Sequence, residues 1–371
     1  MGTSLRIALE TGAEDERPVF LAGTFNDWQA GQETYRMQQD IPGYYSYIFS
    51  DTTLLEYPME FKFTRGTWKQ VETDSYGGYV YNHKLEASTD LVTIHVPRWK
   101  MDGQFWNEKF LPIIETINEH FEIPQLITTR RISALLPWDY YQTDKHYPVL
   151  YLQDGQNLVD PFAPFGTWAL DKKLATMAEN GWADLIVVAI DHAKEDRISE
   201  YTPSYQTKLG PGDGKKYVRF LADTLKPFID KAFRTLPDRQ HTGIGGSSMG
   251  GLISIYAGSM YPEVYGKQMI FSPSLWVAPE IYKKALQTHM LYPTQIYVYA
   301  GGQESENMIP LVEQFTEGMD ANNPEAITLM RVIEPLGKHS ETDWGKAFPD
   351  AANWLFGPYP VTHENFWTKV L

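Results

Sequence analysis

One short stretch of the sequence combines a nucleophilic side chain with the glycines that a tight turn requires. Residues 242–251 read TGIGGSSMGG, and Ser248 is the serine with a glycine two positions away on both sides, Gly246 and Gly250. A nucleophile at a sharp strand-to-helix turn has a strained backbone, and bulky neighbours would clash there. The frame predicts such a serine at the end of a strand; an ordinary small-residue turn beside a sheet is the alternative.

A serine hydroxyl attacks an ester only when a histidine takes its proton and a carboxylate orients that histidine. Of the three histidines after Ser248, His339 follows an expected strand in a glycine-containing loop, whereas the others lie in a helical pattern and in the C-terminal tail. We expect His339 to be the base. The acid should come from the loop after the strand at 295–300, where Glu304 is our choice and Glu306 the alternative.

The oxyanion that forms during acyl transfer needs two backbone N–H donors that are already in place. We expect one from Met249, directly after the nucleophile, and the other from Gln156 in the loop after the strand at 147–152. Gly155 would allow the close approach of that loop. An ordinary strand-to-helix turn is the alternative interpretation of residues 153–157.

Length and composition set limits on the function. At 371 residues the chain is long for a single core, and a net charge of −15 argues against nucleic acid or an anionic membrane surface as a partner. The sequence has no cysteine, and no apolar run approaches membrane-spanning length. We therefore expect a cytoplasmic protein as the sequence stands, or a secreted or periplasmic one if a leader has been removed. The chemistry needs no metal or organic cofactor, and the sequence does not indicate an oligomeric state.

The distribution of apolar and turn-forming residues along the sequence predicts two domains with a connector. Short alternating apolar runs separated by turn residues over 1–98 predict an immunoglobulin-like β-sandwich. Residues 99–126 are expected to form a connector with a short helix near residues 110–114, which packs on the second domain through its aromatic residues. In residues 127–371, apolar runs alternate with helical patterns, notably at 168–180 and 215–233, which predicts an α/β domain with a mostly parallel sheet.

The first domain resembles the glycogen- and starch-binding modules. The resemblance lies in the GTFNDW turn at 23–28, the FKFTRGTW segment at 61–68 and the YN pair at 81–82. It implies that sugar is held by Trp28, Lys62, Trp68 and Asn82. Flat aromatic faces stack on the C–H faces of sugar rings, while amides and ammonium groups meet hydroxyls. The alternative is that both tryptophans pack inside the protein.

The second domain resembles the esterase D-like branch of the α/β-hydrolases, which includes feruloyl, acetyl xylan and siderophore esterases. The resemblance covers roughly residues 121–356 and rests on YPVLYLQDGQ at 147–156, LKPFID at 225–230, YPEVYG at 261–266, FSPSLW at 271–276 and GKH at 337–339, beside the serine motif. It implies an α/β-hydrolase fold. Many members have aspartate as the acid where this chain has Glu304, and the chain lacks the HGxTC loop of S-formylglutathione hydrolases.

These observations predict a serine carboxylic ester hydrolase that works through an acyl-enzyme, with Trp168, Tyr201, Trp276 and the insert at 192–214 forming the wall of its pocket. The sugar-binding resemblance favours an acylated carbohydrate, such as a feruloyl or acetyl ester. One alternative is a siderophore esterase of the enterochelin type. Another is a glucan-binding protein with an inactive hydrolase body.

Overall fold

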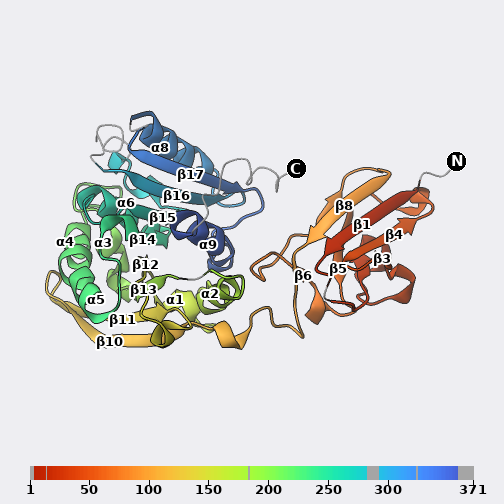
Figure 1. Cartoon of the computed structure of the whole chain (residues 1–371). Coiled ribbons are helices and arrows are strands. Elements are labelled where there is room, and N and C mark those ends of the chain that lie inside the picture. The colour runs from red at the N-terminus through yellow and green to blue at the C-terminus, as the bar shows by residue number, and fades with distance from the viewer. Residues whose placement is uncertain (1–3, 14, 183, 282–291, 323–324, 358–371) are drawn as a thin grey trace. The chain divides into compact units, whose positions relative to one another are not determined.

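The computed structural model describes residues 4–13, 15–182, 184–281, 292–322 and 325–357 and divides the chain into two compact units, residues 1–107 and 108–371 (Figure 1). Each unit has its own apolar core. Among the described residues, no helix combines the length and the apolar character that a membrane span requires.

The first unit is a sandwich of small sheets. A four-stranded sheet has the order β3-β4-β1-β8 and a three-stranded sheet the order β2-β5-β7, while β6 and β9 form a separate pair. Alternate residues of β1, Leu5, Ile7 and Leu9, share a core with Phe61 and Phe63 of β5, so the two larger sheets pack face to face. The strands are β1 (Leu5–Thr11), β2 (Phe20–Gly23), β3 (Gln38–Ile41), β4 (Tyr44–Phe49), β5 (Met59–Thr64), β6 (Glu72–Thr73), β7 (His83–Leu85), β8 (Leu91–Val96) and β9 (Arg98–Trp99).

The second unit is built on one eight-stranded sheet. The order is β10-β11-β13-β12-β14-β15-β16-β17; β10 and β11 are antiparallel to their neighbours, and the strands from β13 to β17 run parallel. This is the α/β-hydrolase fold that the sequence predicted. The strands are β10 (Ile113–Ile123), β11 (Thr128–Leu136), β12 (Val149–Gln153), β13 (Ile186–Ile190), β14 (Thr242–Ser247), β15 (Lys267–Phe271), β16 (Thr294–Gly301) and β17 (Ile327–Glu334).

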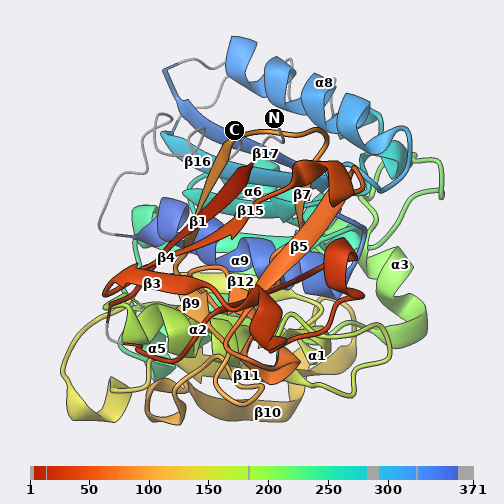
Figure 2. The same cartoon turned by 90° about the vertical axis from the view of Figure 1, so that its right-hand side faces the viewer.

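Helices cover both faces of this sheet (Figures 1 and 2). One set of alternating strand residues, including Val149, Tyr151 and Val298, packs with Leu252 of α6 and Phe315 of α8. On the opposite face of the sheet, α9 packs with α2 and against β15 and β16. The helices are α1 (Gln156–Val159), α2 (Leu170–Glu179), α3 (Arg197–Tyr201), α4 (Gly214–Phe220), α5 (Lys226–Ala232), α6 (Met249–Met260), α8 (Met308–Asn322) and α9 (Glu341–Phe356), and a π-helical turn at Leu221–Leu225 joins α4 to α5.

The expected connector at 99–126 needs correction, because its two halves belong to different units. Trp99 lies in β9, which pairs with β6, and its indole nitrogen donates to Thr11 Oγ1 at 2.9 Å inside the first unit. The second half begins with a 3₁₀ turn at Glu108–Phe110 and then forms β10, where a helix was expected at 110–114. Its sequence after Pro112 suits an extended strand, and pairing with β11 satisfies the backbone groups on one side of β10, which is the edge strand of the sheet.

We expect substitution of Gly345, in the second turn of α9, to lower the stability of the protein measurably. A Cβ atom at this position would lie 2.3 Å from the carbonyl oxygen of Trp168, so Gly345→Ala must displace backbone. We expect a loss of about 1–3 kcal/mol in the free energy of unfolding, because overpacking outweighs the gain in helix propensity. Urea unfolding measures this change. Thr342→Ala, on an exposed position of the same helix, should change the value by less than about 0.5 kcal/mol; an equal effect of both variants would contradict the prediction.

Candidate active site

Ser248 occupies the turn between β14 and α6 with a left-handed backbone, at φ 56° and ψ −121°. The glycines on either side lie where strand and helix are closest. A Cβ on Gly246 would lie 2.9 Å from the carbonyl carbon of Gly250, and one on Gly250 would lie 3.0 Å from Asp154 Oδ2. A side chain at Gly246 would push α6 away from β14, and one at Gly250 would collide with Gln153 and Asp154 at the end of β12, which explains the spacing of the motif.

A line of hydrogen bonds joins Ser248, His339 and Glu304. His339 Nε2 lies 3.0 Å from Ser248 Oγ, and His339 Nδ1 lies 2.6 Å from Glu304 Oε2. The three residues follow β14, β17 and β16, whose parallel carboxyl ends lie at the same edge of the sheet. The Glu304 side chain is 1% exposed and that of His339 is 41% exposed, so the imidazole lies between an enclosed carboxylate and the open side of the site.

The sequence did not decide between Glu304 and Glu306 as the carboxylate beside His339, and the structure distinguishes them. Glu304 Oε1 accepts hydrogen bonds from Ser272 Oγ at 2.6 Å and from Gly301 N at 2.7 Å, while Oε2 faces His339. Glu306 is exposed in the turn before α8. Glu304 is therefore the carboxylate that the fold directs towards the imidazole.

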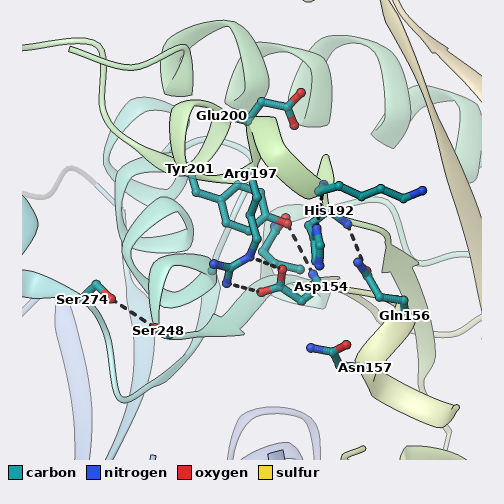
Figure 3. Close-up of polar contacts among 12 residues, drawn as sticks. Asp154, Gln156, Asn157, His192, Arg197, Glu200, Tyr201, Ser248 and Ser274 are labelled. Atoms are coloured by element: carbon teal, nitrogen blue, oxygen red, sulfur yellow. Dashed lines mark hydrogen bonds and ion pairs between the residues drawn. The ribbon is translucent and has the colours of Figure 1, made fainter. Parts of the chain in front are cut away.

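Three further residues support this line and were not foreseen from the sequence. The indole nitrogen of Trp344 donates to Ser272 Oγ at 2.9 Å, and the Trp344 ring packs edge-on against the His339 ring, with centroids 4.8 Å apart. Ser274 Oγ lies 3.2 Å from Ser248 Oγ (Figure 3). The FSPSLW block contains both serines, but nothing in its spacing shows that one would face the carboxylate and the other the nucleophile.

Met249 and Gln156 stand at matching places in the fold. Each is the first residue of a helix, α6 and α1, so its N–H has no acceptor within its own helix. The preceding strands β14 and β12 are parallel neighbours, with Gly245 opposite Leu152, and both helices therefore begin at the same edge of the sheet. A Cβ on Gly155 would lie 2.8 Å from Ile190 N, so this loop packs closely against the end of β13.

The segment from His192 to Tyr201 holds the loop that carries Gln156. Arg197 donates to both carboxylate oxygens of Asp154 at 2.7 and 2.8 Å, and the guanidinium lies on the Ser248 side of that carboxylate (Figure 3). The backbone N–H of His192 donates to Gln156 Oε1 at 3.0 Å. Burial opposes the charge of Arg197, but the hydrogen bonds to Asp154 and the negative charge of that carboxylate together outweigh this effect and raise the pKa of Arg197 above its ordinary value.

The expected pocket wall needs correction for two of its three aromatic residues. Trp168 is 3% exposed and stacks on Phe271 with ring centroids 5.4 Å apart. Tyr201 is fully buried, and its hydroxyl accepts from Asp154 N at 3.4 Å. Both side chains pack against other protein groups and are shielded from solvent, so they support the residues around the site and do not line its surface. Trp276 is 47% exposed and remains available to a ligand.

In the first unit, the structure brings together two of the four residues expected to bind sugar. The rings of Trp28 and Trp68 have centroids 6.3 Å apart and planes inclined by 39°, and Trp68 is 44% exposed. Asn26 fixes the turn that carries Trp28, because its Oδ1 accepts from Gly23 N at 2.9 Å and its Nδ2 donates to Leu21 O at 3.3 Å. The two rings thus form a partly exposed aromatic pair.

Lys62 and Asn82 are engaged within the protein. Lys62 is 4% exposed, its ammonium donates to the carbonyls of Val80 and Tyr81, and it lies 4.7 Å from the centroid of the Tyr79 ring. Asn82 Nδ2 donates to Glu60 Oε2 at 2.9 Å. The direct sugar contact expected of Lys62 is therefore corrected: its ammonium is buried and directs its donors to nearby carbonyls.

Throughout the part of the chain that the structure describes, no group of three or more His, Cys, Asp or Glu side chains is arranged to hold a metal ion.

Comparison with known proteins gives consistent matches. The chain is 25% identical over 246 residues to the protein YbbA of Bacillus subtilis, which covers 62% of this chain and 93% of that protein. It is 23% identical over 235 residues to an endo-1,4-beta-xylanase/feruloyl esterase of Xylanibacter ruminicola, covering 60% of this chain and 29% of that protein. It is also 25% identical over 177 residues to an iron(III) salmochelin esterase of Escherichia coli O6:H1, covering 46% of this chain and 40% of that protein.

Solved structures share the fold. A ferulic acid esterase superposes with a TM-score of 0.52 at 18% identity, over 67% of this chain and 98% of that one. The enterobactin esterase of Shigella flexneri superposes with a TM-score of 0.51 at 14% identity and covers 92% of each chain. The family model described as "Putative esterase" matches residues 124–355, well over half of the sequence. The chain therefore belongs to this esterase family.

Proposed function

We propose that the protein is a serine carboxylic ester hydrolase that works through an acyl-enzyme. The observation that carries the proposal is the line from Ser248 Oγ through His339 to the enclosed Glu304, with contacts of 3.0 and 2.6 Å. A serine becomes nucleophilic in such a line because the imidazole takes its proton as the new bond forms. Membership of the esterase family supports the same reaction class.

In the first half-reaction, Ser248 Oγ attacks the ester carbonyl carbon and its proton passes to His339 Nε2. The bond to the alcohol oxygen then breaks, and the imidazolium gives the proton to the departing alcohol. In the second half, His339 takes a proton from water, the hydroxide attacks the acyl carbonyl, and the acid leaves as Ser248 regains its proton. Glu304 holds the imidazole ring of His339 in its orientation and stabilises the positive charge of the imidazolium. The N–H groups of Met249 and Gln156 stabilise the oxyanion in both halves.

An acylated carbohydrate is the substrate class that we favour. The carboxyl groups of Asp154, Glu304 and Glu341 lie close to the site, and the guanidinium of Arg197 is paired with Asp154. An excess of negative charge opposes an anionic ligand and accepts hydrogen bonds from neutral hydroxyls. The partly exposed Trp28–Trp68 pair of the first unit supports the same class, since aromatic faces stack on sugar rings.

A siderophore esterase is the second candidate. The similarity of the enterobactin esterase fold over 92% of this chain, which includes part of the first unit, favours it, while the charge of the site opposes a catecholate. Parallel assays with para-nitrophenyl acetate, methyl ferulate and a catecholate trilactone distinguish the candidates. Turnover of the trilactone alone would reverse our ranking.

Replacing the nucleophile tests the mechanism. Ser248→Ala should lower kcat for para-nitrophenyl acetate by about 10³-fold or more, because no other hydroxyl has a base at this position. The adjacent Ser247→Ala is the matched control and should retain most activity, since Ser247 is a buried strand residue outside the hydrogen-bonded line. Near-normal turnover by Ser248→Ala would refute the mechanism. A wild-type protein that binds glucan but hydrolyses no ester would instead indicate an inactive hydrolase body.

The two neighbouring glutamates provide a matched pair for the acid. Glu304→Gln should reduce kcat by about 10²–10⁴-fold, since the amide no longer stabilises the imidazolium. Glu306→Gln should change kcat less than about twofold, because Glu306 is exposed and outside the line. Steady-state assays with one ester measure both. The assignment is wrong if Glu306→Gln is the variant that loses activity.

The aromatic pair of the first unit predicts glucan binding. Trp28→Ala should weaken the binding of maltoheptaose about tenfold, because one of the two stacking faces is removed. Isothermal titration with the full chain measures the dissociation constant, and circular dichroism checks that the variant is folded. Tyr44→Ala, which removes another exposed aromatic ring from the same unit, is the control and should leave binding intact. Equal affinity of wild type and Trp28→Ala would exclude this role for the pair.

A further inference from the structure

A cavity of about 410 Å³ lies at the amino ends of the parallel strands, outside the catalytic centre. Its lining includes Lys267, the first residue of β15, and Gln295 and Thr328, the second residues of β16 and β17. Ser248 follows the opposite, carboxyl end of β14, which is the parallel neighbour of β15. The cavity is therefore at the edge of the sheet opposite to the proposed nucleophile, and its volume is in the range of small-molecule sites.

A cationic side chain, that of Lys267, forms part of the cavity wall. Its Nζ donates to Gln295 Oε1 and to the carbonyl oxygen of Leu355 in the last turn of α9, and it lies 5.4 Å from the centroid of the Phe356 ring. An ammonium has three donors, so one of them has no acceptor among the described residues. Burial lowers the pKa of Lys267 to about 8, and no carboxylate in the described part of the chain offsets this effect. The charge of Lys267 is therefore only partly compensated.

A second cation, Arg239, lies next to the same wall and also lacks a carboxylate partner among the described residues. Its guanidinium donates to Pro262 O at 2.9 Å and to Thr294 Oγ1 at 3.1 Å, and Thr294 belongs to the cavity lining. Asp238, the adjacent acidic residue, instead accepts from His241 Nδ1 at 2.8 Å. Two cations with neutral partners are unusual in a chain in which 47 acidic residues outnumber 32 basic ones. This edge of the sheet thus has positive charge that the described side chains do not pair.

We propose that this cavity is a binding site for a small organic anion, a carboxylate or phosphate group on a compact apolar body. The oxygens of such a group accept charge-assisted hydrogen bonds, which an ammonium donates more strongly than a neutral group does. The remaining donor of Lys267 binds one oxygen, the Thr328 hydroxyl is a further donor in the wall, and the Phe356 ring packs on the apolar body. This site goes beyond the proposed ester hydrolysis and does not depend on it.

The expected selectivity follows from the uncompensated charge. An ionised group in a partly buried position is unfavourable without a partner of opposite charge, and a bound anion supplies this partner. A neutral ligand of the same shape contacts the Phe356 ring equally well but leaves the ammonium as it was. The anionic group, and not the apolar body, therefore decides whether a ligand binds.

The first experiment compares three aryl ligands of similar size by isothermal titration with the full chain. Benzoate provides a carboxylate, phenyl phosphate provides a phosphate, and benzamide has the shape of benzoate without its charge. We expect at least one of the two anions to bind about tenfold more tightly than benzamide, and the tighter anion identifies the group that the site takes. Equal affinity of benzamide and both anions, or no binding of either anion, would overturn the inference.

The second experiment locates the bound anion with a matched pair of variants. Thr328 is exposed on β17, so Thr328→Glu places a carboxylate at the cavity without altering the core and should weaken binding of the tighter anion about tenfold. Thr328→Gln, which is nearly the same size but neutral, should change the dissociation constant less than about twofold. An equal loss in both variants would overturn the inference, since size and not charge would then be responsible.

A third variant removes the cation itself. Lys267→Met keeps most of the side-chain volume without the charge and should also weaken binding of the anion about tenfold. Circular dichroism checks the fold of each variant, and the Thr328 pair keeps the test decisive if Lys267→Met does not fold. Wild-type affinity in Thr328→Glu, or in folded Lys267→Met, would overturn the inference, because the anion would then be bound elsewhere on the protein.

Discussion

The left-handed backbone of Ser248 is the constraint on which the site depends. A non-glycine residue at φ 56° costs about 1–2 kcal/mol, and the fold holds it there with hydrogen bonds on both sides. Ser248 N donates to Phe271 O at 2.9 Å, while Ser274 N and Leu252 N donate to Ser248 O at 3.0 and 3.1 Å. These bonds fasten Ser248 to the next strand and to its own helix. The hydroxyl is thereby raised above the edge of the sheet where His339 can reach it.

The neighbouring strand ends in a similar way, and this second turn positions the side chain of Glu304. Ser272, directly after β15, also has a positive φ, of 43°. Its amide donates to Tyr299 O at 2.7 Å and its hydroxyl meets Glu304. Trp344 joins this group to the imidazole, because one side of its ring packs on His339 while its nitrogen bonds Ser272. Four elements from distant parts of the chain therefore fix one carboxylate.

Features that depend on local sequence, such as the turn at Ser248, could be predicted from the sequence. Features that depend on contacts between distant segments could be predicted less well. The glycine spacing around Ser248 and the strand-loop positions of His339 and Glu304 predicted residues that the structure brings together. Glu304 and Glu306 could not be separated, because adjacent loop carboxylates differ only in the direction that the backbone gives them. Trp168 and Tyr201 were expected at the surface of a pocket, but aromatic side chains beside a site also suit its supports. The Asp154–Arg197 pair joins residues 43 positions apart, and the aromatics of 99–126 gave no indication that they divide between two cores.

The indole of Trp344 also determines which way hydrogens point. An indole N–H can only donate, so its bond occupies a lone pair of the Ser272 oxygen and leaves the single hydroxyl proton of Ser272 to face Glu304. Together with Gly301 N–H, this supplies two donors to one oxygen of the carboxylate and leaves the other oxygen to face His339. Trp344, which takes no part in the proposed bond changes, therefore sets the direction in which the hydrogen bonds of this group point.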